Sequence, residues 1–311
     1  MQKRAFTIAE IAIAPNPERW LVNALYDAGI SAGTLDEDSR GLIWLGFHDP
    51  DGLAAALTRA PNIEWVQLPS AGVDDFALAG LLDHKIMWTS AKGAYSQPVA
   101  EHALALIFAM LRDLPIRARA HDWGKPAGTT LHGKRVLIVG AGGIATELLR
   151  LLAPFNNHVV IIRRTPAPVP GAQQTEPFER LSNELAEADI VVLAAALTPL
   201  TRKLIAAPEL HTMNPGAILI NIARGGLIDL DALTTALADK QIRGAALDVT
   251  EPEPLPSSHP LWKEPRALIT PHTADTWDMI WPLLQERIIS NAKHFLAGTD
   301  MRGQINPAAG Y

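Results

Sequence analysis

Three side chains with complementary chemistry each follow a predicted strand in the second half of the chain, namely Arg224, Glu253 and His272. An imidazole has its ordinary pKa close to physiological pH, so His272 suits a general acid. Glu253 would accept a hydrogen bond from the other ring nitrogen, which fixes the tautomer and favours the imidazolium. The planar guanidinium of Arg224 suits a forked contact with carboxylate and carbonyl oxygens, which lysine cannot copy. Together they could protonate a carbonyl oxygen beside a bound carboxylate.

Each of these residues also has an ordinary structural explanation. A histidine after a strand is commonly a hydrogen-bonded surface residue, an arginine is commonly solvated, and Glu253 stands in the turn-like segment EPEPLP. The preceding segments 217–222, 244–249 and 267–270 are short and apolar, as strands buried on both faces of a sheet are. Open α/β sheets bind ligands at the carboxyl ends of their strands, so the combination favours one active site.

A cofactor site is predicted from the segment 134–145, KRVLIVGAGGIA, in which an apolar β-rich run breaks into glycines where a helical pattern opens. In this GxGxxA form Gly140 permits a tight turn, Gly142 lets the backbone approach a pyrophosphate, and Ala145 lets the helix pack on the strand. A purely structural turn is the alternative. The position between strand and helix favours a dinucleotide, with further contacts from Ala141, Gly143 and Ile144.

The next predicted strand, 159–162, ends in Arg163, Arg164 and Thr165. A site for NAD normally carries an acidic residue at this place, which holds the ribose 2′-hydroxyl. Guanidinium groups would instead bind a 2′-phosphate, so NADP(H) is the favoured cofactor and NAD(H) the alternative. A solvated basic strand end would explain the arginines without any ligand.

The first ninety or so residues alternate short apolar runs with helical patterns, which predicts a parallel sheet covered by helices. The expected strands are 6–14, 41–46, 63–68 and 86–89, and the expected helices are 17–28 and 51–59. The loop after the third strand contains Ser70, Ala71, Gly72 and Val73, whose backbone N–H groups could form an anion nest. An ordinary turn explains this loop equally well.

Two longer helices are predicted at 97–114 and 277–297. The first is apolar around most of its circumference, so we expect it to be buried between domains or between subunits. The segment 117–133 after it is polar and glycine-rich with an isolated Trp123, and we interpret it as a connecting arm.

Composition narrows the class of protein. The chain has 311 residues, 48% of them hydrophobic, and a formal charge of -6, which favours neither nucleic acid nor an anionic membrane as a partner. There is no cysteine, which suits a reducing cytoplasm. The start of the chain reaches Glu10 and Pro15 before any long apolar run, so we interpret it as a strand and not a signal peptide. The remaining histidines, including His102 and His211, lack metal-ligand spacing and are expected to be structural or solvent-facing.

The motifs SAGVDD, PVAEHALALIFAMLRD, VLIVGAGGIA, NIARGGLIDLDAL, ALDVTEPEPLP and ITPHTA together resemble the D-isomer-specific 2-hydroxyacid dehydrogenase family over nearly the whole chain. The double arginine, the PLWKEPRALITPH run and the C-terminal GY look most like its glyoxylate and hydroxypyruvate reductase branch. One departure is the segment TADTWDMIW, where Asp275 and Trp277 replace more usual small or basic residues. That difference concerns substrate preference and not reaction type.

The resemblance implies an α/β fold of two doubly wound parallel-sheet domains. A Rossmann cofactor domain, 96–279, would be inserted into a flavodoxin-like substrate domain made of 1–95 and 280–311. The resemblance makes Arg224, Glu253 and His272 catalytic and assigns substrate binding to 70–73 with Arg224 and His272. It places Thr198, Ala223 and Asp248 beside the cofactor, although Asp248 could equally cap a turn. Family members dimerise through the cofactor domain, so helix 97–114 and the arm are the expected interface.

The expected activity is reduction of a small 2-keto acid, glyoxylate or hydroxypyruvate, to the D-2-hydroxy acid by hydride transfer from NADPH. A phosphoglycerate dehydrogenase-like or other D-2-hydroxyacid dehydrogenase that uses NAD is the alternative. Formate dehydrogenase is a further enzyme alternative, but it carries glutamine where Glu253 stands. A non-catalytic, dinucleotide-sensing corepressor-like protein is the alternative of another class, and the intact Arg, Glu and His set argues against it.

Overall fold

The computed structural model describes residues 10–307, so the first part of the predicted strand 6–14 and the C-terminal GY lie outside the described residues. The chain forms two compact units. Unit 1 consists of Met1–Tyr95 with Trp277–Tyr311, and unit 2 of Ser96–Thr276. Among the described residues, no helix combines the length and apolar character needed to cross a membrane.

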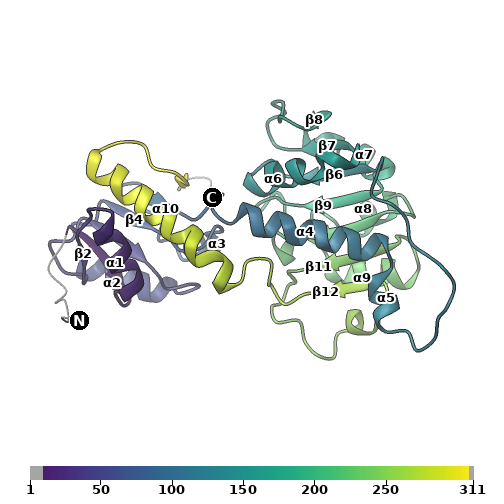
Figure 1. Cartoon of the computed structure of the whole chain (residues 1–311), viewed down its shortest axis with the longest axis horizontal. Coiled ribbons are helices and arrows are strands. Elements are labelled where there is room, and N and C mark those ends of the chain that lie inside the picture. Colours follow the sequence, from purple (N-terminus) through teal and green to yellow (C-terminus); the bar gives the residue numbers. More distant parts are fainter. Residues whose placement is uncertain (1–9, 308–311) are drawn as a thin grey trace. The chain divides into compact units, whose positions relative to one another are not determined.

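Unit 1 contains a five-stranded parallel sheet in the order β2-β1-β3-β4-β5, the flavodoxin-like order. Its strands are β1 (Ile11–Ala14), β2 (Ala32–Gly33), β3 (Gly41–Trp44), β4 (Trp65–Gln67) and β5 (Met87–Thr89). Its helices are α1 (Arg19–Asp27), α2 (Pro50–Arg59), α3 (Asp74–Leu78) and α10 (Trp277–Ala297). All four pairings between these strands are parallel, as the βα alternation predicts (Figure 1).

Helix α10 belongs to unit 1 although it follows unit 2 in sequence. Asn291 on this helix is fully buried, and its amide donates to Gln67 Oε1 on β4 at 2.7 Å and to the Arg302 carbonyl at 2.8 Å. A buried amide without partners would destabilise the fold, so these bonds fix where α10 docks on the sheet.

Unit 2 contains a seven-stranded parallel sheet in the order β12-β11-β10-β9-β6-β7-β8, which extends the Rossmann order by one strand. Its strands are β6 (Arg135–Val139), β7 (His158–Ile162), β8 (Gln174–Glu176), β9 (Ile190–Leu193), β10 (Ile218–Asn221), β11 (Gly244–Leu247) and β12 (Ala267–Ile269). The five interior strands β6, β7, β9, β10 and β11 are buried along almost their whole length. Burial on both faces explains why they are continuously apolar in sequence.

The helices of unit 2 cover the two faces of this sheet (Figure 1). They are α4 (Ser96–Leu111), α5 (Leu114–Ala118), α6 (Gly143–Leu152), α7 (Leu181–Glu187), α8 (Ala207–Thr212) and α9 (Leu230–Ala238). Four short 3₁₀ turns complete the unit at Ala153–Phe155, Phe178–Arg180, Gly225–Leu227 and Pro260–Lys263.

The helix predicted at 97–114 is shorter than expected at its C-terminal end. It ends at Leu111, because Asp113 adopts a left-handed backbone conformation with φ 52° before the separate helix α5 begins. Its apolar surface packs against β10, β11 and α6, all within unit 2. These contacts bury one side of α4 inside unit 2.

Two strands were not predicted. β2 has only two residues, Ala32 and Gly33, and β8 carries the polar segment QTE at the edge of the sheet. Neither gives a run of apolar or β-branched residues, which was the signal used for the other strands.

Candidate active site

The glycine turn joins β6 to α6 as predicted. Gly140 has φ 115°, and a Cβ placed there would lie 2.6 Å from the carbonyl carbon of Ala194, so only glycine fits. Gly142 and Gly143 are exposed, and a Cβ at Gly142 would meet no atom within 4 Å. The first N–H groups of α6 have no partner within the helix. This open helix start, with Ala141 and Ile144 beside it, fits the pyrophosphate of a dinucleotide.

Arg163, Arg164 and Thr165 follow β7 at the carboxyl edge of the sheet, which is the edge where the glycine turn also stands. Arg164 and Thr165 are exposed. Arg163 donates through its backbone N–H to the Glu176 carbonyl on β8 at 3.0 Å, which fixes the start of this loop. The two arginines therefore stand at the position that distinguishes the two dinucleotides.

Two further residues expected near the cofactor follow neighbouring strands at the same edge. Thr198 lies in the loop after β9, where its hydroxyl is 3.1 Å from the hydroxyl of Thr201. Ala223 lies two residues after the end of β10 and is 8% exposed. Ala223 is positioned by its buried strand, whereas Thr198 is held in its loop by hydrogen bonds with Thr201.

Asn221 holds the backbone that presents Arg224. It is the last residue of β10, is 1% exposed, and accepts from the Ala223 N–H at 3.1 Å while donating to the Arg224 carbonyl at 2.9 Å. Arg224 Nη1 donates to the Ala223 carbonyl at 2.8 Å. Asn221 was not predicted as a functional residue, although an asparagine at the end of an apolar strand was a usable signal.

The loop of Arg224 is packed against the loop of Glu253. A Cβ at Gly225 would lie 2.5 Å from the backbone nitrogen of Glu251 and closer still to the Thr250 carbonyl, so only glycine allows this approach. Arg202 and Glu251 add an exposed ion pair of 2.8 Å beside it. The close backbone contact sets the spacing between the guanidinium and the carboxylate.

Glu253 and His272 form the predicted hydrogen bond. Glu253 Oε2 is 2.9 Å from His272 Nδ1, and Oε1 accepts from the Thr250 N–H at 2.9 Å. The hydrogen bond to Glu253 raises the pKa of His272, against the opposing effects of burial and of Arg224. Burial opposes ionisation of Glu253, but the hydrogen bonds from His272 and Thr250 lower its pKa. The side chains are 42% and 39% exposed, so a ligand can reach the imidazole.

Asp248, directly after β11, is 2% exposed and holds the loop of His272. Its Oδ1 accepts from the Thr270 hydroxyl at 2.5 Å and the Thr273 N–H at 3.0 Å, and its Oδ2 accepts from the Ala274 N–H at 3.0 Å. Burial opposes its ionisation, but these bonds and one from His102 lower the pKa of Asp248 to about 2. The carboxylate thus caps this turn, which was the alternative explanation of Asp248.

Asp275 places a second carboxyl group in this neighbourhood. Burial raises its pKa, and the nearby Asp248 adds to that effect, while His272 and Arg224 oppose it. The residues described contain no group of three His, Asp or Glu arranged to hold a metal ion.

The loop Ser70–Val73 follows β4 in unit 1. The Ser70 hydroxyl donates to the Gly72 carbonyl at 2.6 Å and closes the turn. Within residues 10–307, the backbone N–H groups of Ala71, Gly72 and Val73 donate no hydrogen bond. The loop therefore has the donors that an anion nest requires.

A family model described as "D-isomer specific 2-hydroxyacid dehydrogenase, NAD binding domain" matches residues 104–274, which include the glycine turn and all three candidate catalytic residues. The chain belongs to this family. It is accordingly an NAD(P)-dependent D-2-hydroxyacid dehydrogenase with a Rossmann dinucleotide-binding domain.

The relatives of this dehydrogenase are named for different substrates, and one of them is uncharacterized. An uncharacterized protein in the proB 3′ region of Corynebacterium melassecola is 40% identical over 80% of this chain and 84% of its own length. Glyoxylate reductase of Thermofilum pendens is 32% identical over 84% and 83% of the two chains. D-3-phosphoglycerate dehydrogenase of Mycobacterium tuberculosis is 33% identical over 70% of this chain but only 42% of that protein.

A solved structure of the family superimposes on nearly the whole dehydrogenase. It is a D-isomer-specific 2-hydroxyacid dehydrogenase from Xanthobacter autotrophicus Py2 in complex with NADPH and MES. The TM-score is 0.84 with 29% identity, and the match covers 97% of this chain and 99% of that one.

Proposed function

We propose that this dehydrogenase reduces a small 2-keto acid, glyoxylate or hydroxypyruvate, to the D-2-hydroxy acid with NADPH. The observation that carries the proposal is the bond between Glu253 Oε2 and His272 Nδ1 at 2.9 Å, with Arg224 close enough to act on the pKa of both partners. The reaction needs a proton donor and an anion clamp, and these side chains supply both.

The residues of this chain have separate roles in the proposed reaction. His272 as imidazolium donates its Nε2 proton to the carbonyl oxygen, while Glu253 holds the ring through Nδ1. Arg224 binds the carboxylate and carbonyl oxygens. The loop Ser70–Val73, in unit 1, offers backbone donors for an anion. When bound, the reduced nicotinamide supplies a hydride to the carbonyl carbon. The turn 140–144, with Arg163–Thr165, Thr198 and Ala223, would hold that cofactor. Asp248 would lie beside it and support the loop of His272.

The test is the loss of nicotinamide absorbance when the purified protein is mixed with NADPH and a panel of 2-keto acids. We expect turnover with glyoxylate or hydroxypyruvate. Absence of turnover with every acid in the panel would refute the proposal. Turnover only of 3-phosphohydroxypyruvate with NADH would favour the phosphoglycerate dehydrogenase-like alternative.

The pH profile tests the role of Glu253. Because Glu253 raises the pKa of His272, the imidazolium persists at pH values above its ordinary range, and reduction should decline only as pH rises through the raised pKa. In Glu253→Gln the declining limb of kcat/KM should move to lower pH. Glu251→Gln removes a carboxylate that pairs with Arg202 instead, so its limb should coincide with that of the wild type. Coincident limbs in all three proteins would contradict the assignment.

The choice of cofactor is proposed to depend on Arg163 and Arg164. The Xanthobacter relative was solved with NADPH, which supports this choice. In Arg163→Asp combined with Arg164→Ser, KM for NADPH should rise by about tenfold or more relative to KM for NADH, because charged hydrogen bonds to the 2′-phosphate are lost. Arg180→Ser, an exposed arginine on the turn Phe178–Arg180, is the matched control. An unchanged KM ratio would remove both arginines from the proposal.

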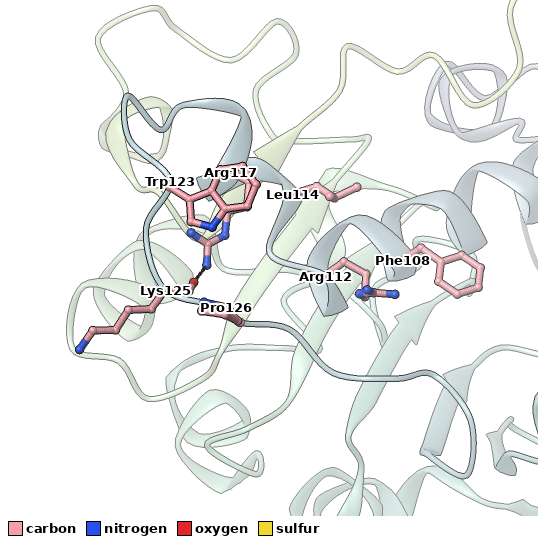
Figure 2. A pocket seen from close by; sticks show the side chains of 8 residues that line it. Phe108, Arg112, Leu114, Arg117, Trp123, Lys125 and Pro126 are labelled. Carbon is pink, nitrogen blue, oxygen red and sulfur yellow. Dashed lines mark hydrogen bonds between the residues drawn. The ribbon is translucent and has the colours of Figure 1, made fainter.

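A homodimer through unit 2 is also proposed. The arm is exposed from Ala118 to Gly128, and Trp123 is 96% exposed. Arg117 donates to the Lys125 carbonyl and so fixes the arm, as Figure 2 shows. A cavity of about 530 Å³ lies between the arm, α5 and the end of α4 (Figure 2). Its apolar lining includes Phe108, Leu114 and Trp123. An indole held so far into solvent suits the core of a two-fold interface.

Light scattering tests the dimer. We expect a mass twice the 33.6 kDa of one chain for the wild type and a shift toward one chain for Trp123→Ser combined with Leu114→Ser. Trp262→Ser changes a tryptophan of the same unit that is 45% exposed and lies outside the cavity, so it should stay dimeric. A wild-type mass of one chain at micromolar concentration would exclude this interface.

A further inference from the structure

His102 stands outside the proposed catalytic set but contacts the buried carboxylate behind it. It lies on α4, its side chain is 19% exposed, and its Nε2 is 3.3 Å from Asp248 Oδ1 and 3.1 Å from Thr270 Oγ1. Asp248 in turn accepts from Thr270, Thr273 and Ala274, and its own carbonyl accepts from the His272 N–H at 2.8 Å. All the bonds lie within unit 2.

The hydrogen positions in this cluster follow from its geometry. An ionised carboxylate only accepts, and the single hydroxyl proton of Thr270 points to Asp248 Oδ1 at 2.5 Å. His102 Nε2 therefore faces two acceptors and must carry a hydrogen. His102 is a donor in its Nε2–H tautomer or as imidazolium. A side chain without that hydrogen would remove the hydrogen bond that Asp248 Oδ1 and Thr270 Oγ1 receive from it.

The cluster acts on the loop that carries His272. His272 has a left-handed backbone with φ 49°, which few non-glycine residues adopt. Thr270 and Thr273, which flank the pair Pro271–His272, are bound to the same Asp248 oxygen. Fixing that oxygen fixes the direction in which the imidazole meets Glu253.

We propose that His102 is a positioning residue for His272, which it holds toward Glu253 through Asp248 and Thr270. The inference rests on the proposed function for its effect on catalysis but not for its effect on the loop. The groups that act on the His272 imidazole are Glu253, Arg224, Asp248 and Asp275, so a change at His102 reaches it through the position of the loop.

Two variants test the proposal. His102→Phe keeps a flat ring and removes the Nε2 hydrogen, whereas His102→Gln keeps a donor near the same place. NMR titration of the imidazoles in the protein without ligands should show the pKa of His272 above its ordinary value in the wild type and His102→Gln, and lower in His102→Phe. With NADPH and the best 2-keto acid, kcat of His102→Phe should fall about tenfold at unchanged KM, since misplacement of a catalytic group acts on turnover.

The outcomes separate the two proposals. A protein that reduces no 2-keto acid refutes the proposed function, while the titration still decides the role of His102. An unchanged His272 pKa in folded His102→Phe overturns the positioning role, and so does an Nδ1–H tautomer of His102 in the imidazole nitrogen spectrum. If circular dichroism shows His102→Phe to be unfolded, Thr270→Val replaces it, and an unchanged His272 pKa there overturns the role equally.

Discussion

His272→Asn is expected to lower kcat for 2-keto acid reduction by about 10²–10⁴-fold, the range that a positioned general acid contributes. Asparagine keeps a donor that can reach Glu253, so the loop should remain in place while the exchangeable proton on Nε2 is lost. Steady-state kinetics with NADPH measure the effect. The KM for NADPH should change little, because the glycine turn and Arg163–Thr165 follow other strands.

His211→Asn is the matched control for this change. It lies on α8, is exposed, and should retain wild-type turnover. Wild-type turnover in His272→Asn would assign the proton donor to another group, whatever the behaviour of the control.

Arg224→Lys should reduce kcat/KM by about 10²-fold or more, equivalent to about 2.7 kcal/mol of transition-state stabilisation. Lysine keeps the charge but cannot make the forked contact, and a hydrogen bond to a charged group contributes about 1.5–3 kcal/mol. Steady-state kinetics with the best 2-keto acid measure this loss of kcat/KM. The amide of that acid, which lacks the carboxylate charge, should not restore the activity of the variant.

Arg202→Lys provides the comparison. Arg202 is 50% exposed and pairs with Glu251 at 2.8 Å beside the same loops. Exposed ion pairs contribute at most about 1 kcal/mol, so this variant should stay close to wild type. Equal losses in the two variants would mean that disturbance of the loops, and not the forked contact, explains the result.

The sequence was sufficient to predict the sheet architecture, because strands buried on both faces are recognisable as short apolar runs. It was also sufficient to place Arg224, Glu253 and His272 at strand ends, and the expected bond between Glu253 and His272 is present at 2.9 Å. Their catalytic roles stay predictions. The polar edge strand β8 and the end of α4 at Leu111 could not be predicted from apolar runs. The strand contains no such run, and the apolar pattern continues past the end of the helix.

The residues that support the candidate catalytic set could not be predicted from the sequence, for a different reason. His102 contacts Thr270 across 168 positions of sequence, and no local pattern encodes that pairing. Asp248 was predicted near the cofactor with a turn cap as its alternative, and its four donors became visible only once the loops were folded. Asn221 is the exception, because a polar residue ending the apolar run ILIN already required a partner.

The bare backbone at Gly225 limits how this enzyme can be redesigned. Since it lies against the peptide between Thr250 and Glu251, a one-residue insertion on either side displaces the other segment as well. Libraries that diversify only one of the two segments should therefore yield mostly inactive clones, whereas exchanging both together with those of a homologue preserves their mutual fit. New specificities in this scaffold are better sought in segments free of that constraint, such as the one containing Asp275 and Trp277.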